Sequence, residues 1–390
     1  MNPVDAVVLL IVVSYAVLGY LRGFVAGAVA MVGLIAGGVV GLVVSPLLLT
    51  RLEHGTVRSL VAVILVLVLA SAGQAIGSQV GTRLRGRMTH PPARALDAAG
   101  GVALSAVACL VVCWALGYAV SGSQIPGAST AVRGSQVLGK VDSVMPQGVR
   151  TALHSFDSVV DATLFPRYLE PFAPETIKPA AAPDPAVLQR PEVQSARRSV
   201  ARVTGRAECN RGLEGSGFVY AKERVMTNAH VVAGVDDPAV TVGDKTYDAD
   251  VVYYDPSLDV AVLRARGLRA PAIPFDEDAR QGQSAAVLGF PENGPFDARA
   301  ARIRSEQRLR SPDIYGSAQV VREVYSLRGL VRSGNSGGPM ISEDGRVLGV
   351  IFAASISDSS TGYALTAGQV GEAARKGVRA TRGLDTGPCA

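Results

Sequence analysis

Long apolar segments dominate the first 120 residues of the chain, at Ala6–Leu21, Phe24–Val44, Ser59–Val80 and Gly100–Val120. Each approaches the roughly 20 residues that a helix needs to cross a bilayer. A cleaved signal peptide at the first segment, or a buried helical core, would be the alternatives. The first segment, however, lacks a basic start and is followed at once by another apolar segment. The pattern therefore predicts four transmembrane helices in a region spanning residues 1–120.

The hydrophobic pattern changes over residues 200–370. Short apolar runs alternate there with Gly, Pro and Asp turns, and long helical patterns are few. Such spacing is typical of antiparallel strands. We therefore predict an all-β domain over residues 199–390, so that the chain is a multi-domain protein with a helical membrane region followed by a β domain.

Residues 121–198 are predicted to form a connector between these two parts. Ser121–Ser135 is rich in Gly and Ser and is typical of a loop. An amphipathic helix is indicated further on by apolar residues that recur every three to four positions, at Val149, Leu153, Phe156, Val160 and Leu164. Pro171–Pro191, rich in Pro and Ala, is typical of an extended, exposed linker and is a candidate site of self-cleavage.

Arginine placement predicts the orientation of the membrane region. The loops after the first and third apolar segments carry Arg22 and then Arg83, Arg85, Arg87 and Arg94. Arg-rich loops stay in the cytoplasm. An even number of spans then places both termini and the β domain outside. The net charge of +5 comes partly from these arginines. No basic patch interleaved with aromatic residues is apparent, so no nucleic-acid partner is predicted.

The sequence Gly334-Asn335-Ser336-Gly337-Gly338-Pro339 is the most informative motif of the β domain. Taken alone, such a run is an ordinary turn. Glycines around a serine also allow a tight turn and the close approach of a substrate. The amides of Gly334 and Ser336 can then point to one place, as an oxyanion hole requires. Ser336 is therefore a candidate nucleophile.

A serine nucleophile needs a base and a group that orients the base. Thr227-Asn228-Ala229-His230 and Leu258-Asp259-Val260 lie upstream, with gaps of 29 (259−230) and 77 (336−259) residues. Each residue also has a structural interpretation, as a packed histidine or a strand-end carboxylate. Together, His230, Asp259 and Ser336 predict a catalytic triad; Asp255 is the nearest rival to Asp259.

At these residues the chain resembles a known family. Gly215-Ser216-Gly217-Phe218-Val219, the segment up to His230 and the motifs at Asp259 and Ser336 resemble trypsin-like proteases of the HtrA (Deg) group. The resemblance covers about 180 residues, the span of one domain, and its motifs are specific. It implies a chymotrypsin-like fold of two antiparallel β-barrels, with the site in the cleft between them.

Substrate contacts follow from the same resemblance. The strand Val350–Ala354 is expected to pair with the substrate backbone, which makes Phe352, Ala353 and Ala354 candidate binding residues. Leu330 is the candidate for the base of the primary pocket. Two features depart from the family. The 390 residues leave no room for the PDZ modules that HtrA proteins usually carry, and Asn335 replaces the Asp that activates digestive enzymes after cleavage.

The membrane region carries a second resemblance. Val4-Asp5-Ala6-Val7-Val8 and Leu18-Gly19-Tyr20-Leu21-Arg22-Gly23-Phe24 resemble the colicin V production (CvpA) family of multi-span proteins. A CvpA-like segment joined to an HtrA-like protease resembles the actinobacterial membrane-anchored acid-resistance periplasmic serine proteases. This resemblance implies a role in the cell envelope under acid or oxidative stress.

Four cysteines complete the candidate chemistry. Cys109 and Cys113 lie one helical turn apart in the fourth apolar segment and are expected to pack there. Cys209 and Cys389 flank the protease region, and in an oxidising compartment they suggest a disulfide. The spacings resemble no metal site, and no cofactor is predicted.

These observations predict a membrane-anchored, extracytoplasmic serine endopeptidase that cleaves envelope proteins. Its predicted partners are peptide substrates and the lipid bilayer, and the sequence leaves the oligomeric state open. A membrane scaffold or transport protein, whose outer domain only binds peptides, is the alternative. The presence of all three triad residues favours the enzyme.

Overall fold

The computed structural model describes residues 2–48, 56–121, 128–146, 149, 177–207, 212–355 and 358–389. The chain forms two compact units. One contains residues 1–118 together with 135–143, and the other contains residues 119–134 together with 144–390. The connector predicted at 121–198 is therefore divided between the two units. Cys209 and the predicted amphipathic positions 153–164 lie outside the described residues.

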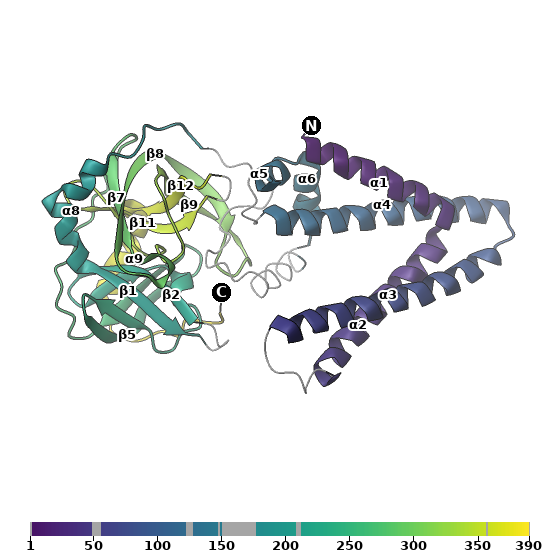
Figure 1. The fold of residues 1–390 in the computed structure, drawn as a ribbon, viewed down its shortest axis with the longest axis horizontal. Coiled ribbons are helices and arrows are strands. Elements are labelled where there is room, and N and C mark those ends of the chain that lie inside the picture. Colours follow the sequence, from purple (N-terminus) through teal and green to yellow (C-terminus); the bar gives the residue numbers. More distant parts are fainter. Residues whose placement is uncertain are drawn as a thin grey trace. The chain divides into compact units, whose positions relative to one another are not determined.

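The first unit is helical (Figure 1). Its helices are α1 (Pro3–Arg22), α2 (Phe24–Leu48), α3 (Thr56–Gly86), α4 (Pro91–Ser121) and the short α6 (Gln136–Val144). Among the described residues, Pro3–Arg22, Phe24–Gly41 and Pro91–Tyr118 are long and apolar enough to cross a membrane. Apolar N-terminal helices are thus confirmed. The third predicted span, Ser59–Val80, lies within α3 (Thr56–Gly86), and its membrane role stays a prediction.

Glycines allow these helices to approach closely. A Cβ atom built on Gly33 of α2 would lie 2.2 Å from the carbonyl oxygen of Gly73 in α3, and one on Gly77 would lie 2.4 Å from that of Val29. Helices in membranes commonly pack through such small residues. The α2–α3 pair therefore depends on glycine at these crossing points.

The second unit contains two closed sheets (Figure 1). The first barrel has the strand order β1-β2-β3-β6-β5-β4. Its strands are β1 (Val200–Arg206), β2 (Gly212–Ala221), β3 (Arg224–Thr227), β4 (Ala239–Val242), β5 (Lys245–Asp255) and β6 (Val260–Ala265). The β-rich fold of the protease region is thus confirmed.

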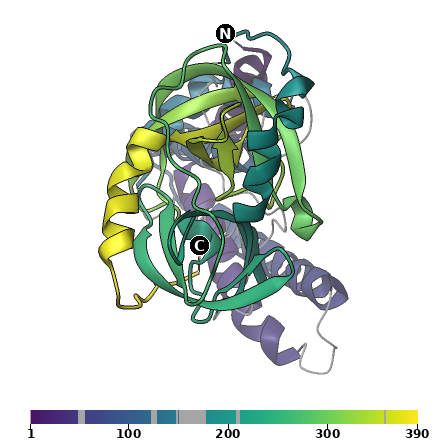
Figure 2. The same cartoon turned by 90° about the vertical axis from the view of Figure 1, so that its left-hand side faces the viewer.

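The second barrel has the order β10-β11-β12-β9-β8-β7. Its strands are β7 (Ser284–Gly289), β8 (Asp297–Pro312), β9 (Gln319–Arg328), β10 (Pro339–Ile341), β11 (Val347–Ala354) and β12 (Thr361–Thr366). The helix α9 (Ala367–Arg379) packs on strands of both barrels, and Figure 2 shows it beside both of them. Thr366 caps this helix by accepting the amide hydrogen of Gln369.

The segment before the first barrel differs from the predicted linker. Residues 185–189 form the 3₁₀-helix η2 (Pro185–Gln189), and α8 (Pro191–Ala196) and η3 (Arg197–Ser199) follow. Val187 and Val193 are buried in the same core cluster as residues of both barrels. The interpretation of Pro171–Pro191 as extended and exposed is therefore wrong for its last residues, because the apolar positions between the prolines pack on the protease.

Arginines of the second barrel hold the described start of this segment. Arg304, Arg328 and Arg302 donate hydrogen bonds to the carbonyl oxygens of Lys178 (2.9 Å), Ala180 (2.7 Å) and Ala182 (3.0 Å), respectively. Every second carbonyl is bound, so residues 178–182 run extended along β8 and β9. A second difference from prediction is α5 (Ala128–Arg133), a short helix inside the stretch Ser121–Ser135 that was expected to be loop.

Candidate active site

Ser336 lies in the loop between β9 and β10, in a turn formed by glycines. Gly334 and Gly337 have φ values of 84° and 82°, a region that residues with a Cβ atom rarely adopt. A Cβ atom on Gly337 would lie 2.2 Å from the carbonyl oxygen of Ser216. The Ser336 side chain is buried, and its Oγ has no hydrogen-bond partner among the described residues. The predicted tight turn is therefore present.

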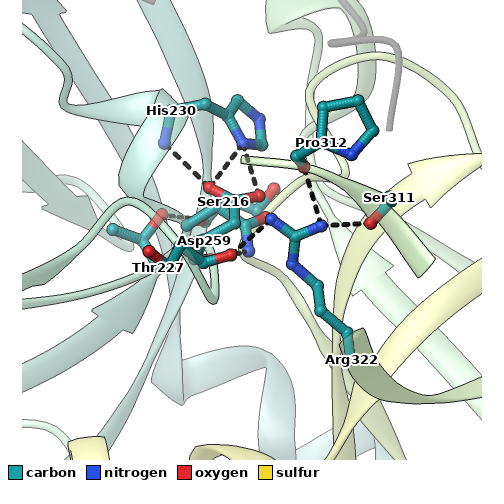
Figure 3. Close-up of polar contacts among 9 residues, drawn as sticks. Ser216, Thr227, His230, Asp259, Ser311, Pro312 and Arg322 are labelled. Atoms are coloured by element: carbon teal, nitrogen blue, oxygen red, sulfur yellow. Dashed lines mark hydrogen bonds and ion pairs between the residues drawn. The ribbon is translucent and has the colours of Figure 1, made fainter. Parts of the chain in front are cut away.

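His230 and Asp259 form a buried pair (Figure 3). His230 lies in η4 (Ala229–Val231), directly after β3, and Asp259 immediately precedes β6. The imidazole Nδ1 lies 3.0 Å from Oδ1 and 2.9 Å from Oδ2 of Asp259, and the backbone amide of His230 donates to Oδ1 at 2.9 Å. This geometry fixes the ring and leaves Nε2 as the atom able to accept a proton.

Asp259 is held in an unusual backbone conformation. Its φ is 63°, which is uncommon for a residue other than glycine, although Asp tolerates it better than most. The side-chain amide Nδ2 of Asn228 donates to the backbone carbonyl oxygen of Asp259 at 2.8 Å. This bond ties the turn of Asp259 to the segment that carries His230.

The rival residue Asp255 has a different role. Its Oδ1 accepts the amide hydrogens of Ser257 and Leu258, both at 3.0 Å. It therefore caps the turn that leads to Asp259. The structure brings Asp259 into contact with the His230 ring.

The Ser336 turn is connected to the strand preceding His230. The amide of Ser216 in β2 donates to the carbonyl oxygen of Ser336 at 2.8 Å. Thr227, three residues before His230, donates its hydroxyl hydrogen to the carbonyl oxygen of Ser216 at 2.7 Å (Figure 3). Ser216 thereby links the loop of the second barrel to the histidine segment of the first.

Two residues around this site were missed by sequence reasoning. Ser216 was part of a quoted motif but had no role assigned. Arg322 in β9 is fully buried, and its guanidinium donates to the carbonyl oxygens of Ser257 (2.5 Å) and Pro312 (3.0 Å) and to the hydroxyl of Ser311 (Figure 3). An arginine of the second barrel thus holds the turn two residues before Asp259. Nothing local in the sequence indicates that contact.

The predicted substrate-binding residues differ in exposure. Leu330 is 42% exposed, whereas Phe352 and Ala353 are buried and Phe352 belongs to the core. The Phe352 side chain therefore packs inward. Pairing of β10 with β11 ends at Pro339 and Val350, although β11 continues to Ala354.

The C-terminal segment lies against the histidine loop. Cys389 takes part in a disulfide bond, whereas Cys109 and Cys113 are free. A Cβ atom on Gly234, four residues after His230, would lie 3.0 Å from the amide nitrogen of Cys389. The predicted partner Cys209 lies outside the described residues.

Closed β-barrels with a buried histidine–aspartate pair and a serine in a glycine turn are the features of a trypsin-like serine peptidase. The comparisons with known proteins agree. Residues 215–350 match the family model described as a trypsin-like peptidase domain, and residues 4–146 match the model of the colicin V production protein.

The serine protease Rv3671c of Mycobacterium tuberculosis is 39% identical over 99% of this chain and 98% of that protein. The crystal structure of the Rv3671c protease in its active form is 47% identical, with a TM-score of 0.54, over 57% of this chain and 98% of that one. The chloroplastic Protease Do-like 1 of Arabidopsis thaliana is 32% identical over 40% of this chain.

The chain therefore belongs to the same family as Rv3671c. It is a serine endopeptidase that combines a CvpA-like, apolar N-terminal segment with an HtrA-like protease domain.

Proposed function

We propose that this chain is a multi-pass membrane protein whose extracytoplasmic domain cleaves envelope proteins through an acyl-enzyme on Ser336. The observation that carries this proposal is the buried contact of the His230 ring with both carboxylate oxygens of Asp259, on a segment linked through Ser216 to the Ser336 turn. The family membership supports the same reaction.

In the proposed mechanism, Ser336 Oγ attacks the scissile carbonyl carbon. Nε2 of His230 takes the hydroxyl proton and later gives it to the leaving amine. Asp259 accepts the Nδ1 hydrogen and stabilises the charged imidazole. A water molecule then attacks the acyl-enzyme with the same histidine as its base. The lack of a hydrogen-bond partner for Ser336 Oγ among the described residues is consistent with an atom kept for the substrate.

We propose that the amides of Gly334 and Ser336 bind the oxyanion. The carbonyl oxygen of Ser333 accepts the amide hydrogen of Glu292 at 2.7 Å. The Ser333 carbonyl and the Gly334 N–H belong to the same peptide bond. In a trans peptide these two groups point in opposite directions, so the N–H of Gly334 points away from Glu292. The Asn335 carbonyl accepts the amide of Gly338 at 2.9 Å, which orients the Ser336 amide in the same manner.

The substrate backbone is proposed to pair with Ala353 and Ala354. The support is that β10 stops pairing at Val350 while β11 continues, so this end of the strand has no pairing with β10. Leu330, exposed and six residues before Ser336, stays the candidate for the primary pocket. Phe352 would contribute through its backbone only, because its side chain belongs to the core.

An extracytoplasmic site is proposed from the arginine-rich loops and from the disulfide at Cys389. Disulfides persist in oxidising compartments. We propose Cys209 as the partner, because Cys109 and Cys113 are free. The role in acid or oxidative stress rests on the family resemblance alone.

The Ser336→Ala variant of the full chain tests the reaction. Purified in detergent and given unfolded casein, it should lose about 10,000-fold or more in kcat. Its melting temperature should stay near that of the parent, because the lost hydroxyl has no partner among the described residues. Proteolysis at a near-parental rate would contradict the serine mechanism. A parent chain that binds casein without cleaving it would favour the scaffold alternative.

A further inference from the structure

Ser216 is a fully buried residue that makes four hydrogen bonds around the Ser336 turn. Its amide donates to the carbonyl oxygen of Ser336 at 2.8 Å, and its hydroxyl donates to that of Gly334 at 2.6 Å. The hydroxyl accepts the amide hydrogen of Phe290 at 2.9 Å, and the Ser216 carbonyl accepts the hydroxyl hydrogen of Thr227 at 2.7 Å. One residue of β2 thus contacts two carbonyls of the nucleophile turn.

The direction of the hydroxyl hydrogen follows from its neighbours. A serine hydroxyl has one hydrogen to donate and lone pairs to accept. The Phe290 amide can only donate, and the Gly334 carbonyl can only accept. The hydrogen of Ser216 is therefore committed to Gly334, and the side chain holds the Gly334–Asn335 peptide in one orientation.

The carbonyl of the Gly334–Asn335 peptide is held by this side-chain bond. Gly334 has a φ of 84° and no side chain, so its backbone has wide conformational freedom. The neighbouring peptides of the turn are held by backbone donors, since Glu292 binds the carbonyl of Ser333 and Gly338 binds that of Asn335. At Gly334 the partner is a side-chain hydroxyl. The N–H of the same peptide donates to the carbonyl oxygen of Arg332 at 3.0 Å. Removing the Ser216 hydroxyl would leave that bond alone to orient a glycine peptide that lies between the two proposed oxyanion amides.

The space around Ser216 fits a small side chain. Cβ atoms built on Gly289 and Gly338 would lie 2.6 Å from the Ser216 Oγ and 3.2 Å from its Cβ, respectively. Two glycines therefore close around the serine, and a larger residue would displace them. The site accommodates a hydroxyl on a single carbon.

We propose that Ser216 is a positioning residue for the reaction: its hydroxyl fixes the Gly334–Asn335 peptide so that the amides of Gly334 and Ser336 converge on the oxyanion. This inference rests on the proposed function, because it assumes attack by Ser336. Ser216 itself touches neither substrate nor the reacting atoms.

The test is Ser216→Ala in the full chain, with Ser326→Ala as the matched control. Ser326 is also a fully buried serine of the protease, and its hydroxyl has no partner among the described residues. Active sites are counted by titration with a fluorophosphonate, so that misfolded molecules do not enter kcat. Peptide cleavage and inhibition by a peptide aldehyde, which forms an oxyanion, are then measured per active site.

Ser216→Ala should lower kcat by about 100-fold, the effect of losing one oxyanion donor. KM should change little, and the aldehyde should bind weaker by a similar factor, because it resembles the transition state. The pH profile should keep its shape, since His230 and Asp259 are untouched. Ser326→Ala should match the parent.

A Ser216→Ala chain with parental kcat per active site would overturn the inference. So would a chain that yields no titratable sites, because Ser216 would then act in folding and not in positioning. The Ser336→Ala variant distinguishes failure of the proposed mechanism from failure of this inference. If that variant still cleaves peptides, the proposed mechanism fails whatever Ser216 does; if it is inactive and Ser216→Ala is normal, only the inference fails.

Discussion

The turn at Ser336 depends on backbone conformations that glycine adopts readily and that residues with a Cβ atom rarely adopt. Gly334 and Gly337 take left-handed φ values of 84° and 82°, within the tight turn that the glycines of the motif predict. His230 and Ser336 were candidates from sequence because each lies in a short, local pattern. The bond from the Ser216 hydroxyl to the Gly334 carbonyl joins residues separated by 118 positions, and no local pattern encodes it. The same limit applies to Arg322, whose bond to Ser257 spans 65 positions.

Gly337→Ala tests how tightly this turn is built. The new methyl group would lie 2.2 Å from the Ser216 carbonyl oxygen and 2.3 Å from Thr227 Oγ1, at a φ of 82°. Strain and displacement together should cost about 3 kcal/mol or more in the free energy of unfolding. Most peptidase activity should be lost with it. Urea unfolding and peptide cleavage of the purified protein measure both effects.

Gly371→Ala in α9 is the control for that substitution. Its methyl group would meet only the ends of the Arg375 and Glu277 side chains, at 3.4 and 3.7 Å. Alanine is favoured over glycine inside a helix by about 0.5–1 kcal/mol. This variant should therefore be as stable as the parent or slightly more stable. Equal losses in both variants would mean that the Gly337 turn is less constrained than described.

At the scale of elements, strands and apolar helices followed from hydrophobic periodicity, whereas the segment before β1 did not. Pro and Ala favour an extended linker when read locally. Packing of Val187 and Val193 on the barrels, and bonds from three arginines of β8 and β9, decide the conformation instead. The three arginines lie more than a hundred residues further along the chain, so composition alone could not reveal their bonds.

The tail after α9 joins parts of both barrels. The Tyr315 hydroxyl, from the second barrel, lies 2.7 Å from that of Tyr254 in the first and donates to the carbonyl of Thr386 at 3.1 Å. Burial, with the neighbouring Tyr315 hydroxyl, raises the pKa of Tyr254 far above its ordinary value. Tyr254 therefore stays protonated, and the contact persists, over the whole physiological pH range. The Leu384 amide donates to the carbonyl of Val251 at 2.7 Å.

The proposed Cys209–Cys389 bond would fasten this tail beside His230. Closing a loop of about 180 residues contributes at most roughly 5 kcal/mol by the chain-entropy model. Reduction should therefore lower the melting temperature by about 5–15 °C. Activity should fall as well, because the tail packs at Gly234. A chain in which Cys109 and Cys113 are replaced by serine should respond identically.

Peptide mapping of the non-reduced protein decides the pairing. Cys209 and Cys389 should be recovered in one linked peptide. Recovery of two separate peptides, or a linkage of Cys389 to another cysteine, would contradict the proposal.

At the scale of the whole molecule, the sequence predicted a helical membrane region followed by a β-rich protease, and the two compact units and the two family matches agree with it. The side of the membrane on which the protease acts is proposed from the placement of arginines and from the disulfide at Cys389. The geometry of a protease domain is the same on either side. Orientation therefore requires a measurement on cells.

The most direct test measures two things at once: which residue is the nucleophile and on which side of the membrane it lies. Intact cells that make the full chain are treated with a charged, membrane-impermeant fluorophosphonate, and the labelled peptide is identified by mass spectrometry. We expect a single adduct, on Ser336, that is absent from the Ser336→Ala chain and strongly reduced by His230→Ala. An adduct on another serine, or labelling of Ser336 only after the cells are opened, would contradict the account.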